Sequence, residues 1–291
     1  MSKEEVELGF FENVPYEEYE KWKGLRGSNL WTMIEKTPAH YKYQVENPSD
    51  YVATELNIGH ATHTAVLEPE LFEGLYEVLP ARYINAKGED KPFNMNANIC
   101  KEMKADILER GVIPLKRSEY DLCRFLRDSV WRNPTAVTLL KAGKKELSMR
   151  WLDKTTGRLM KGRMDLWIES GGIVADLKTA RNASVRIFGA DSYRLGYHFK
   201  MAMYYAGAAT LSKVEMGNPV LIAVEKEPPY LTHCFEVERD ERICGEAQLS
   251  TVMEKVVECE KSGEWPGYSQ GLTPLMLPAY AGQEIDSTHE Q

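Results

Sequence analysis

The chain has 291 residues, a formal net charge of −8 and 43% hydrophobic residues. This length suffices for a sizeable core, and we expect one catalytic domain with a helical N-terminal part. No apolar run is long enough to span a bilayer and the acidic N-terminus is unlike a secretory signal, so we expect no membrane partner and a cytoplasmic location.

Charge is distributed unevenly along the chain. Residues 141–200 carry thirteen Lys and Arg against six Asp and Glu, whereas residues 1–20 carry seven Glu and one Lys. A basic zone around carboxylates suits a phosphate-bearing substrate, although a solvated face of mixed charge has the same composition. The five cysteines are scattered without a C-x-x-C pair, which argues against a disulfide framework, a zinc knuckle or an iron–sulfur cluster.

The first half of the chain is predicted to be mainly helical. We expect residues 1–27 to form an acidic, aromatic arm that packs on the body or on a neighbouring subunit. Ser28 is expected to cap a helix that Pro38 ends, and further helices are predicted at 56–67, 94–110 and 118–132, with a loop at 76–91. His63 lies on the 56–67 helix, where it is either structural or a ligand. Residues 28–140 are therefore predicted to form one wall of a cleft.

Three strands are predicted next, at 146–151, 158–168 and 172–178. If Ser170 and Gly171 are the central turn residues, the numbers of antiparallel partners sum to 341 and Asp165 lies opposite Asp176. Directly opposed like charges destabilise a sheet, so this register suggests a divalent cation between the two carboxylates. Lys178 shares a strand face with Asp176 because side chains alternate with a period of two.

Glu146 opens the neighbouring strand. It could be a third acid of the site, the partner of an arginine that orients phosphate, or simply a surface residue.

The remainder of the chain alternates helix and strand. A helix is predicted at 197–211, on which Lys200 and Tyr204 are four apart and share a face. Strands follow at 220–225 and 232–237, then a helix at 240–261 and a C-terminal tail at 269–291. The pattern predicts an α/β fold with a mixed central sheet flanked by helices, and residues 141–268 form its catalytic core.

The cluster of Asp165, Asp176 and Lys178 suits metal-assisted phosphodiester hydrolysis. Carboxylates can hold a divalent ion that activates water, and a lysine supplies positive charge near the phosphate. Asp and Lys at strand ends also form ordinary surface ion pairs, so an Asp-x-Lys triplet alone does not decide the chemistry.

Five segments together resemble the PD-(D/E)xK nuclease superfamily, and within it the exonuclease VIII, or RecE-like, phage-type exonucleases. The segments are Gly59-His60-Ala61-Thr62-His63 with Leu67-Glu68-Pro69; Gly162-Arg163-Met164-Asp165; Ala175-Asp176-Leu177-Lys178-Thr179; Tyr197 to Tyr204; and Ile222 to Tyr230 with Trp265 to Tyr268. The resemblance runs from about Ser28 to Tyr268 and implies a restriction-endonuclease-like core.

Carried over residue by residue, the resemblance implies that His63, Asp165, Asp176 and the Leu177 carbonyl bind metal. Lys178 would be the catalytic lysine, and Tyr204 would support the site or contact DNA. Glu146, Arg163, Thr179 and Lys200 are expected DNA contacts. Lys200 stands where the family usually has Gln, which puts the usual orienting role of that position in doubt.

The resemblance implies a Mg²⁺-dependent exonuclease, with Mn²⁺ as a substitute, that degrades linear double-stranded DNA from 5′ to 3′. Its expected partners are DNA ends, a single-strand annealing protein used in recombination, and further copies of itself in a homo-oligomeric ring. Its expected location is the cytoplasm of a bacterial host, as for a phage or prophage protein. A structure-specific or restriction-type endonuclease and a catalytically inactive DNA-end-binding subunit are the alternatives.

Overall fold

A mixed six-stranded sheet forms the centre of the molecule in the computed structural model, which describes residues 6–47 and 58–276. The strand order is β1-β6-β7-β8-β9-β10, with β8 and β9 parallel and the other neighbours antiparallel. The strands are β1 (Gly9–Phe11), β6 (Lys144–Leu152), β7 (Leu159–Ile168), β8 (Ile173–Ala180), β9 (Val220–Glu225) and β10 (Thr232–Glu236). The predicted α/β fold with a mixed sheet is confirmed.

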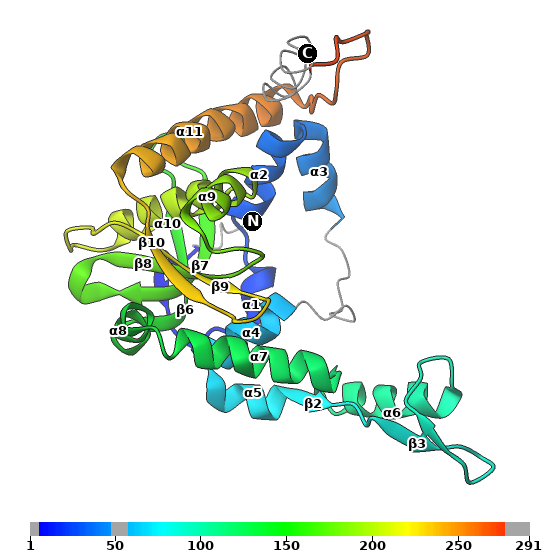
Figure 1. Ribbon diagram of the computed structural model, residues 1–291. Coiled ribbons are helices and arrows are strands. Elements are labelled where there is room, and N and C mark those ends of the chain that lie inside the picture. The colour runs from blue at the N-terminus through cyan, green and yellow to red at the C-terminus, as the bar shows by residue number, and fades with distance from the viewer. Residues whose placement is uncertain (1–5, 48–57, 277–291) are drawn as a thin grey trace, which may run out of the picture.

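Helices cover both faces of this sheet (Figure 1). On one face α10 contacts β6, β7 and β8, and α11 packs on α10. On the other face α4 contacts β8, α7 contacts β9 and α8 contacts β7. The bounds of these helices are α4 (Ile58–Leu67), α7 (Arg117–Val130), α8 (Pro134–Ala142), α10 (Tyr197–Leu211) and α11 (Arg239–Ser262). The site elements β7 and β8 are therefore enclosed between two helical layers.

The arm of the N-terminus packs on the body of its own chain. Its strand β1 pairs with β6, so that Phe10 lies opposite Met149 and stacks on Trp167 with ring centroids 5.6 Å apart. Helix α1 (Tyr16–Lys21) follows, and the Lys161 ammonium donates to the backbone carbonyls of Tyr19 and Glu20 at its end. Cations near a helix C-terminus are favourable, and this contact ties the arm to β7. Residues 1–5 of the predicted arm lie outside the described residues.

Two helices join the arm to the region before α4. They are α2 (Gly27–Glu35) and α3 (Pro38–Glu46). The predicted cap at Ser28 is wrong, because α2 begins at Gly27 with Arg26 at its N-cap. Pro38 does not simply end that helix: it is the first residue of α3, whose N-terminus Thr37 caps by accepting the His40 N–H. A proline tolerates this position because the missing N–H would have no helical partner.

A lobe projects from the body beyond α5 (Pro69–Leu75) and α7 (Figure 1). It consists of the parallel pair β2 (Tyr76–Val78) and β5 (Ile113–Leu115), the hairpin β3 (Arg82–Ile84) and β4 (Asp90–Pro92), and α6 (Asn98–Glu109). The loop predicted over 76–91 thus contains strands. Those strands are three residues long, too short to give a periodic pattern in sequence.

Later elements agree closely with the predicted ranges. Helix α10 and strand β9 have the predicted bounds, and β6, β7, β8, β10 and α11 differ from prediction by one to two residues at most ends. Five helices had no predicted counterpart: α1, α3, α5, α8 and α9 (Val185–Arg194). The start of the predicted 56–67 helix and residues 277–291 of the predicted tail lie outside the described residues.

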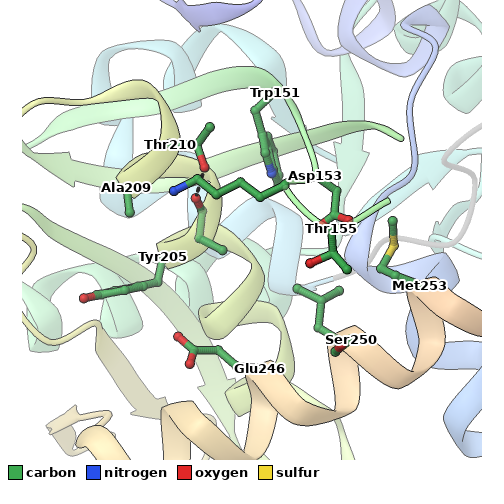
Figure 2. A pocket seen from close by; sticks show the side chains of 12 residues that line it. Trp151, Asp153, Thr155, Tyr205, Ala209, Thr210, Glu246, Ser250 and Met253 are labelled. Atoms are coloured by element: carbon green, nitrogen blue, oxygen red, sulfur yellow. Dashed lines mark hydrogen bonds between the residues drawn. The ribbon is translucent and has the colours of Figure 1, made fainter. Parts of the chain in front are cut away.

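A cavity of about 300 Å³ lies between α10, α11 and the turn after β6 (Figure 2). Trp151 and Met253 provide apolar walls, whereas Thr155 and Glu246 provide polar ones. None of the predicted site residues lines it. No helix among the described residues is long and apolar enough to cross a bilayer, and all five cysteines are free thiols.

Candidate active site

The β7–β8 hairpin has the predicted register. Its paired residues are Leu166 with Ala175, Trp167 with Val174, and Ile168 with Ile173. The connection is a 3₁₀ turn at Glu169–Gly171, in place of the expected two-residue turn, and is followed by Gly172 with φ 59°. A Cβ at Gly172 would lie 2.1 Å from the Glu215 carbonyl oxygen, so both backbone conformation and packing require glycine there.

The hairpin pairing ends just before Asp165 and Asp176. In place of a further backbone pair, the Asp165 carboxylate accepts the Leu177 N–H at 2.6 Å. His63, half-buried on α4, lies with Nδ1 3.4 Å from Asp165 Oδ2. A residue of the helical layer and a residue of the sheet thereby meet, although about a hundred positions separate them in sequence.

Glu146 adds a third group to this pair. It sits in β6 between the pairs Lys145–Leu166 and Leu147–Met164, which places it beside Asp165. Its φ of 49° is in the left-handed region, which is uncommon for a residue with a side chain and is often found at functional sites. Arg163 Nε donates to Glu146 Oε2 at 2.7 Å. Ligand atoms of His63, Glu146 and Asp165 all lie within 4.8 Å of one another.

Burial shifts the pKa values of Glu146 and His63 in the directions expected of a metal site. Burial, together with the nearby Asp165 charge, raises the pKa of Glu146 to about 7. Burial also lowers the pKa of His63, which keeps the imidazole neutral and able to ligate. Two crowded carboxylates and a neutral imidazole are a donor set that fits a divalent cation.

Asp176 has different neighbours. It is fully buried, with 0% exposure, and Lys178 Nζ donates to its Oδ2 while Lys200 Nζ donates to its Oδ1 at 3.0 Å. Burial alone would favour the neutral acid, but the two ammonium groups outweigh it and hold the pKa of Asp176 below its usual range. Asp176 is thus a carboxylate with a cation on each oxygen.

The two lysines rest against aromatic rings of α10. Lys178 Nζ lies 5.0 Å from the Tyr197 ring centroid, and Lys200 Nζ lies 5.2 Å from that of Tyr204. Such contacts stabilise a cation by about 0.5–2 kcal/mol. Burial lowers the pKa of Lys178; it acts on Lys200 too, but there the Asp176 charge prevails and raises the pKa. Burial raises the pKa of Tyr204 to about 12, so its hydroxyl stays protonated.

Tyr204 is also fixed from the sheet side. A Cβ built on Gly162 would come within 2.8 Å of Tyr204 Cε1, so the glycine of the Gly162-Arg163-Met164-Asp165 segment lets this ring lie against β7. Close approach of a ring to a backbone is a common reason for a glycine inside a strand.

The structure gathers most of the predicted site residues into one place. His63, Glu146, Arg163 and Asp165 form one group, and Asp176, Lys178, Lys200 and Tyr204 form the other. The Leu177 carbonyl accepts from Lys178 Nζ at 3.4 Å. Thr179 follows Lys178 and, because side chains alternate along a strand, lies on the other face of β8.

Two neighbours of the site had no predicted role. The Tyr197 ring lies against the Lys178 ammonium. Tyr197 is three residues before Lys200 on the predicted helix, and this spacing places both residues on the same helix face. Tyr19 of the arm is buried beside Arg163, with the guanidinium 6.0 Å from its ring centroid. No sequence pattern linked Tyr19 to the hairpin, because the arm reaches β7 only through tertiary packing.

The family model of a PDDEXK-like domain of unknown function (DUF3799) matches residues 28–273. A crystal structure from Eubacterium rectale, described as a "putative exonuclease", is similar in fold with a TM-score of 0.57 and 13% identity, over 94% of this chain and 98% of that one. The crystal structure of SSO0001 matches with a TM-score of 0.33 and 14% identity, over 85% of this chain and 80% of that one. No curated protein matches the sequence.

Proposed function

Because the family model covers most of its length, the chain belongs to the family of PDDEXK-like domains of unknown function (DUF3799), and we propose that it is a metal-dependent DNA nuclease. One observation carries the proposal: His63, Glu146 and Asp165 converge beside the buried Asp176–Lys178 pair. A structural ion pair needs only one acid and one base. A second carboxylate beside the first repels it and makes both harder to ionise, so this crowding indicates a cation-binding site.

The residues of the site have separable tasks in phosphodiester hydrolysis. His63, Glu146 and Asp165 would hold a divalent ion, with Asp176 and the Leu177 carbonyl beside it. Such an ion, when bound, activates a water and stabilises the leaving oxygen. Lys178 offers a positive charge to the phosphate where negative charge develops, and the Tyr197 ring keeps its ammonium in position. Arg163 orients Glu146 through its Nε.

We extend the proposal to an exonuclease that uses Mg²⁺, or Mn²⁺ in its place, and degrades linear duplex DNA from 5′ to 3′. The support is the order of the motifs from Gly59 to Tyr268 and their likeness to RecE-like exonucleases. The same likeness supports a single-strand annealing partner and a homo-oligomeric ring. The name of the Eubacterium rectale protein, which shares the fold, is in accord with this activity.

The test compares linear and covalently closed circular duplexes of one sequence, incubated with the full chain and Mg²⁺. We expect the linear DNA to be degraded and the closed circle to remain. A label on either the 5′ or the 3′ end reports the polarity, and the 5′ label should be released first. Efficient cutting of the closed circle would show an endonuclease instead, and binding of ends without any cutting would show an inactive end-binding subunit.

A further inference from the structure

Both carboxylate oxygens of Asp176 already have a cation. Lys178, from the same strand, contacts Oδ2, and Lys200, from α10, contacts Oδ1 at 3.0 Å. Asp176 has 0% exposure, so solvent does not compete for these oxygens. The two lysines come from different elements, which means that the backbone positions of β8 and α10 together determine the arrangement.

The Lys200 side chain is 32% exposed, and its ammonium has two partners, Asp176 and Tyr204. Its ammonium lies against the ring of Tyr204, and that ring is held between α10 and Gly162 of β7. Tyr204 has 5% exposure, so the ring has little room to move. A lysine held in this way acts as a permanent positive charge beside Asp176 Oδ1.

The formal charges of the site balance before any metal is added. Glu146, Asp165 and Asp176 contribute three negative charges, while Arg163, Lys178 and Lys200 contribute three positive ones. One divalent ion has a place at His63, Glu146 and Asp165, where the ligand atoms lie within 4.8 Å of one another. A second ion would need a further carboxylate oxygen, and both oxygens of Asp176 already face an ammonium group, Lys178 at Oδ2 and Lys200 at Oδ1.

We propose, resting on the nuclease function above, that the site works with one divalent ion and that the Lys200 ammonium occupies the place of a second. Lys200 holds Asp176, so that this carboxylate keeps its orientation without a second metal. A neutral residue at position 200 would free Oδ1 and open a second ion site.

The experiment counts Mn²⁺ ions per chain by isothermal titration calorimetry on the full chain without DNA. We expect one ion for the wild type and two for Lys200→Gln, whose amide oxygen can itself ligate. Lys200→Arg keeps the positive charge and should retain one ion. Lys255→Gln removes an exposed lysine of α11 that pairs with Glu258, and should also retain one. Circular dichroism and the unfolding temperature of each variant report whether it folds.

A second readout uses the Mg²⁺ dependence of cleavage of a linear duplex. The Hill coefficient should be about one for the wild type and rise toward two for Lys200→Gln. Two ions, or none, on the wild-type chain would overturn the proposal even if the variants fail to fold, and so would a single ion on a folded Lys200→Gln. A wild type that binds one ion and cuts no DNA would instead overturn the nuclease function while leaving the one-ion site intact.

Discussion

The two halves of the site, only a strand apart, are built on opposite electrostatic principles. In the half formed by His63, Glu146 and Asp165, a single cation, Arg163, stands against two carboxylates. In the half formed by Asp176, Lys178 and Lys200, two cations stand against one carboxylate. The first half therefore retains negative charge that attracts a metal, whereas the second retains positive charge that suits a phosphate.

The difference follows from which elements supply each half. Residues of α4, β6 and β7 form the acidic half. Its cation, Arg163 of β7, donates to Glu146. Residues of β8 and α10 form the basic half, and Lys200, the lysine of α10, donates to Asp176. Charged groups with perturbed pKa values, such as Glu146, Asp176 and Lys178, cluster at functional sites. Substitutions in either half test this difference in charge.

The largest effect is expected from Asp176→Ala, which removes the anion of the basic half. Activity on linear duplex should fall at least about a hundredfold, as when a charge-stabilising group of an active site is lost. Two ammonium groups lose their common partner, and breaking a buried ion pair costs about 3–5 kcal/mol of stability. DNA binding, measured by fluorescence anisotropy, should be retained. Asp106→Ala, on an exposed carboxylate of α6, is the control; wild-type activity in Asp176→Ala would place the chemistry elsewhere.

A smaller effect is expected from His63→Ala in the acidic half. Loss of a ligand should weaken Mn²⁺ binding by at least about tenfold, because mutation of a residue that only hydrogen-bonds to a metal ligand already lowers metal affinity by about that factor. The matched control is His60→Ala on the same helix, whose exposed ring lies against the edge of Tyr16 instead of Asp165. Calorimetry compares the two variants. Equal Mn²⁺ affinity in both would mean that His63 is a structural histidine.

The smallest effect is expected from Gly162→Ala, which acts on the basic half through Tyr204. The added methyl group would come within 2.8 Å of Tyr204 Cε1 and 3.1 Å of Met149 Cε. Overpacking of this kind costs about 1–3 kcal/mol, seen as a lower midpoint in urea. Gly189→Ala in α9 meets no atom within 4 Å and should be neutral or stabilising by up to about 1 kcal/mol. A Gly162→Ala variant as stable as Gly189→Ala would show that the ring is free to move.

Local features of this site could be predicted from the sequence because they depend on near neighbours in the chain. The register of the β7–β8 hairpin follows from the length of the turn between Ile168 and Ile173, and it holds although the turn is of another type than expected. The shared face of Lys200 and Tyr204 follows from the helical period. The missed elements are short strands and the helices α1, α3, α5, α8 and α9. These helices have at most 10 residues, so the periodic signal of each is short.

Local sequence patterns are enough to specify the α/β character, the hairpin that carries Asp165 and Asp176, and the helix that carries Lys200. Each of these rests on the period of apolar residues or on a turn, which a few adjacent residues specify. Three contacts depend instead on the packing of the whole chain: Glu146 lies with His63 and Asp165, the arm pairs with β6, and Lys200 donates to the second oxygen of Asp176. These contacts join residues far apart in the chain, and they depend on how helices pack on the two faces of the sheet, which no local pattern encodes.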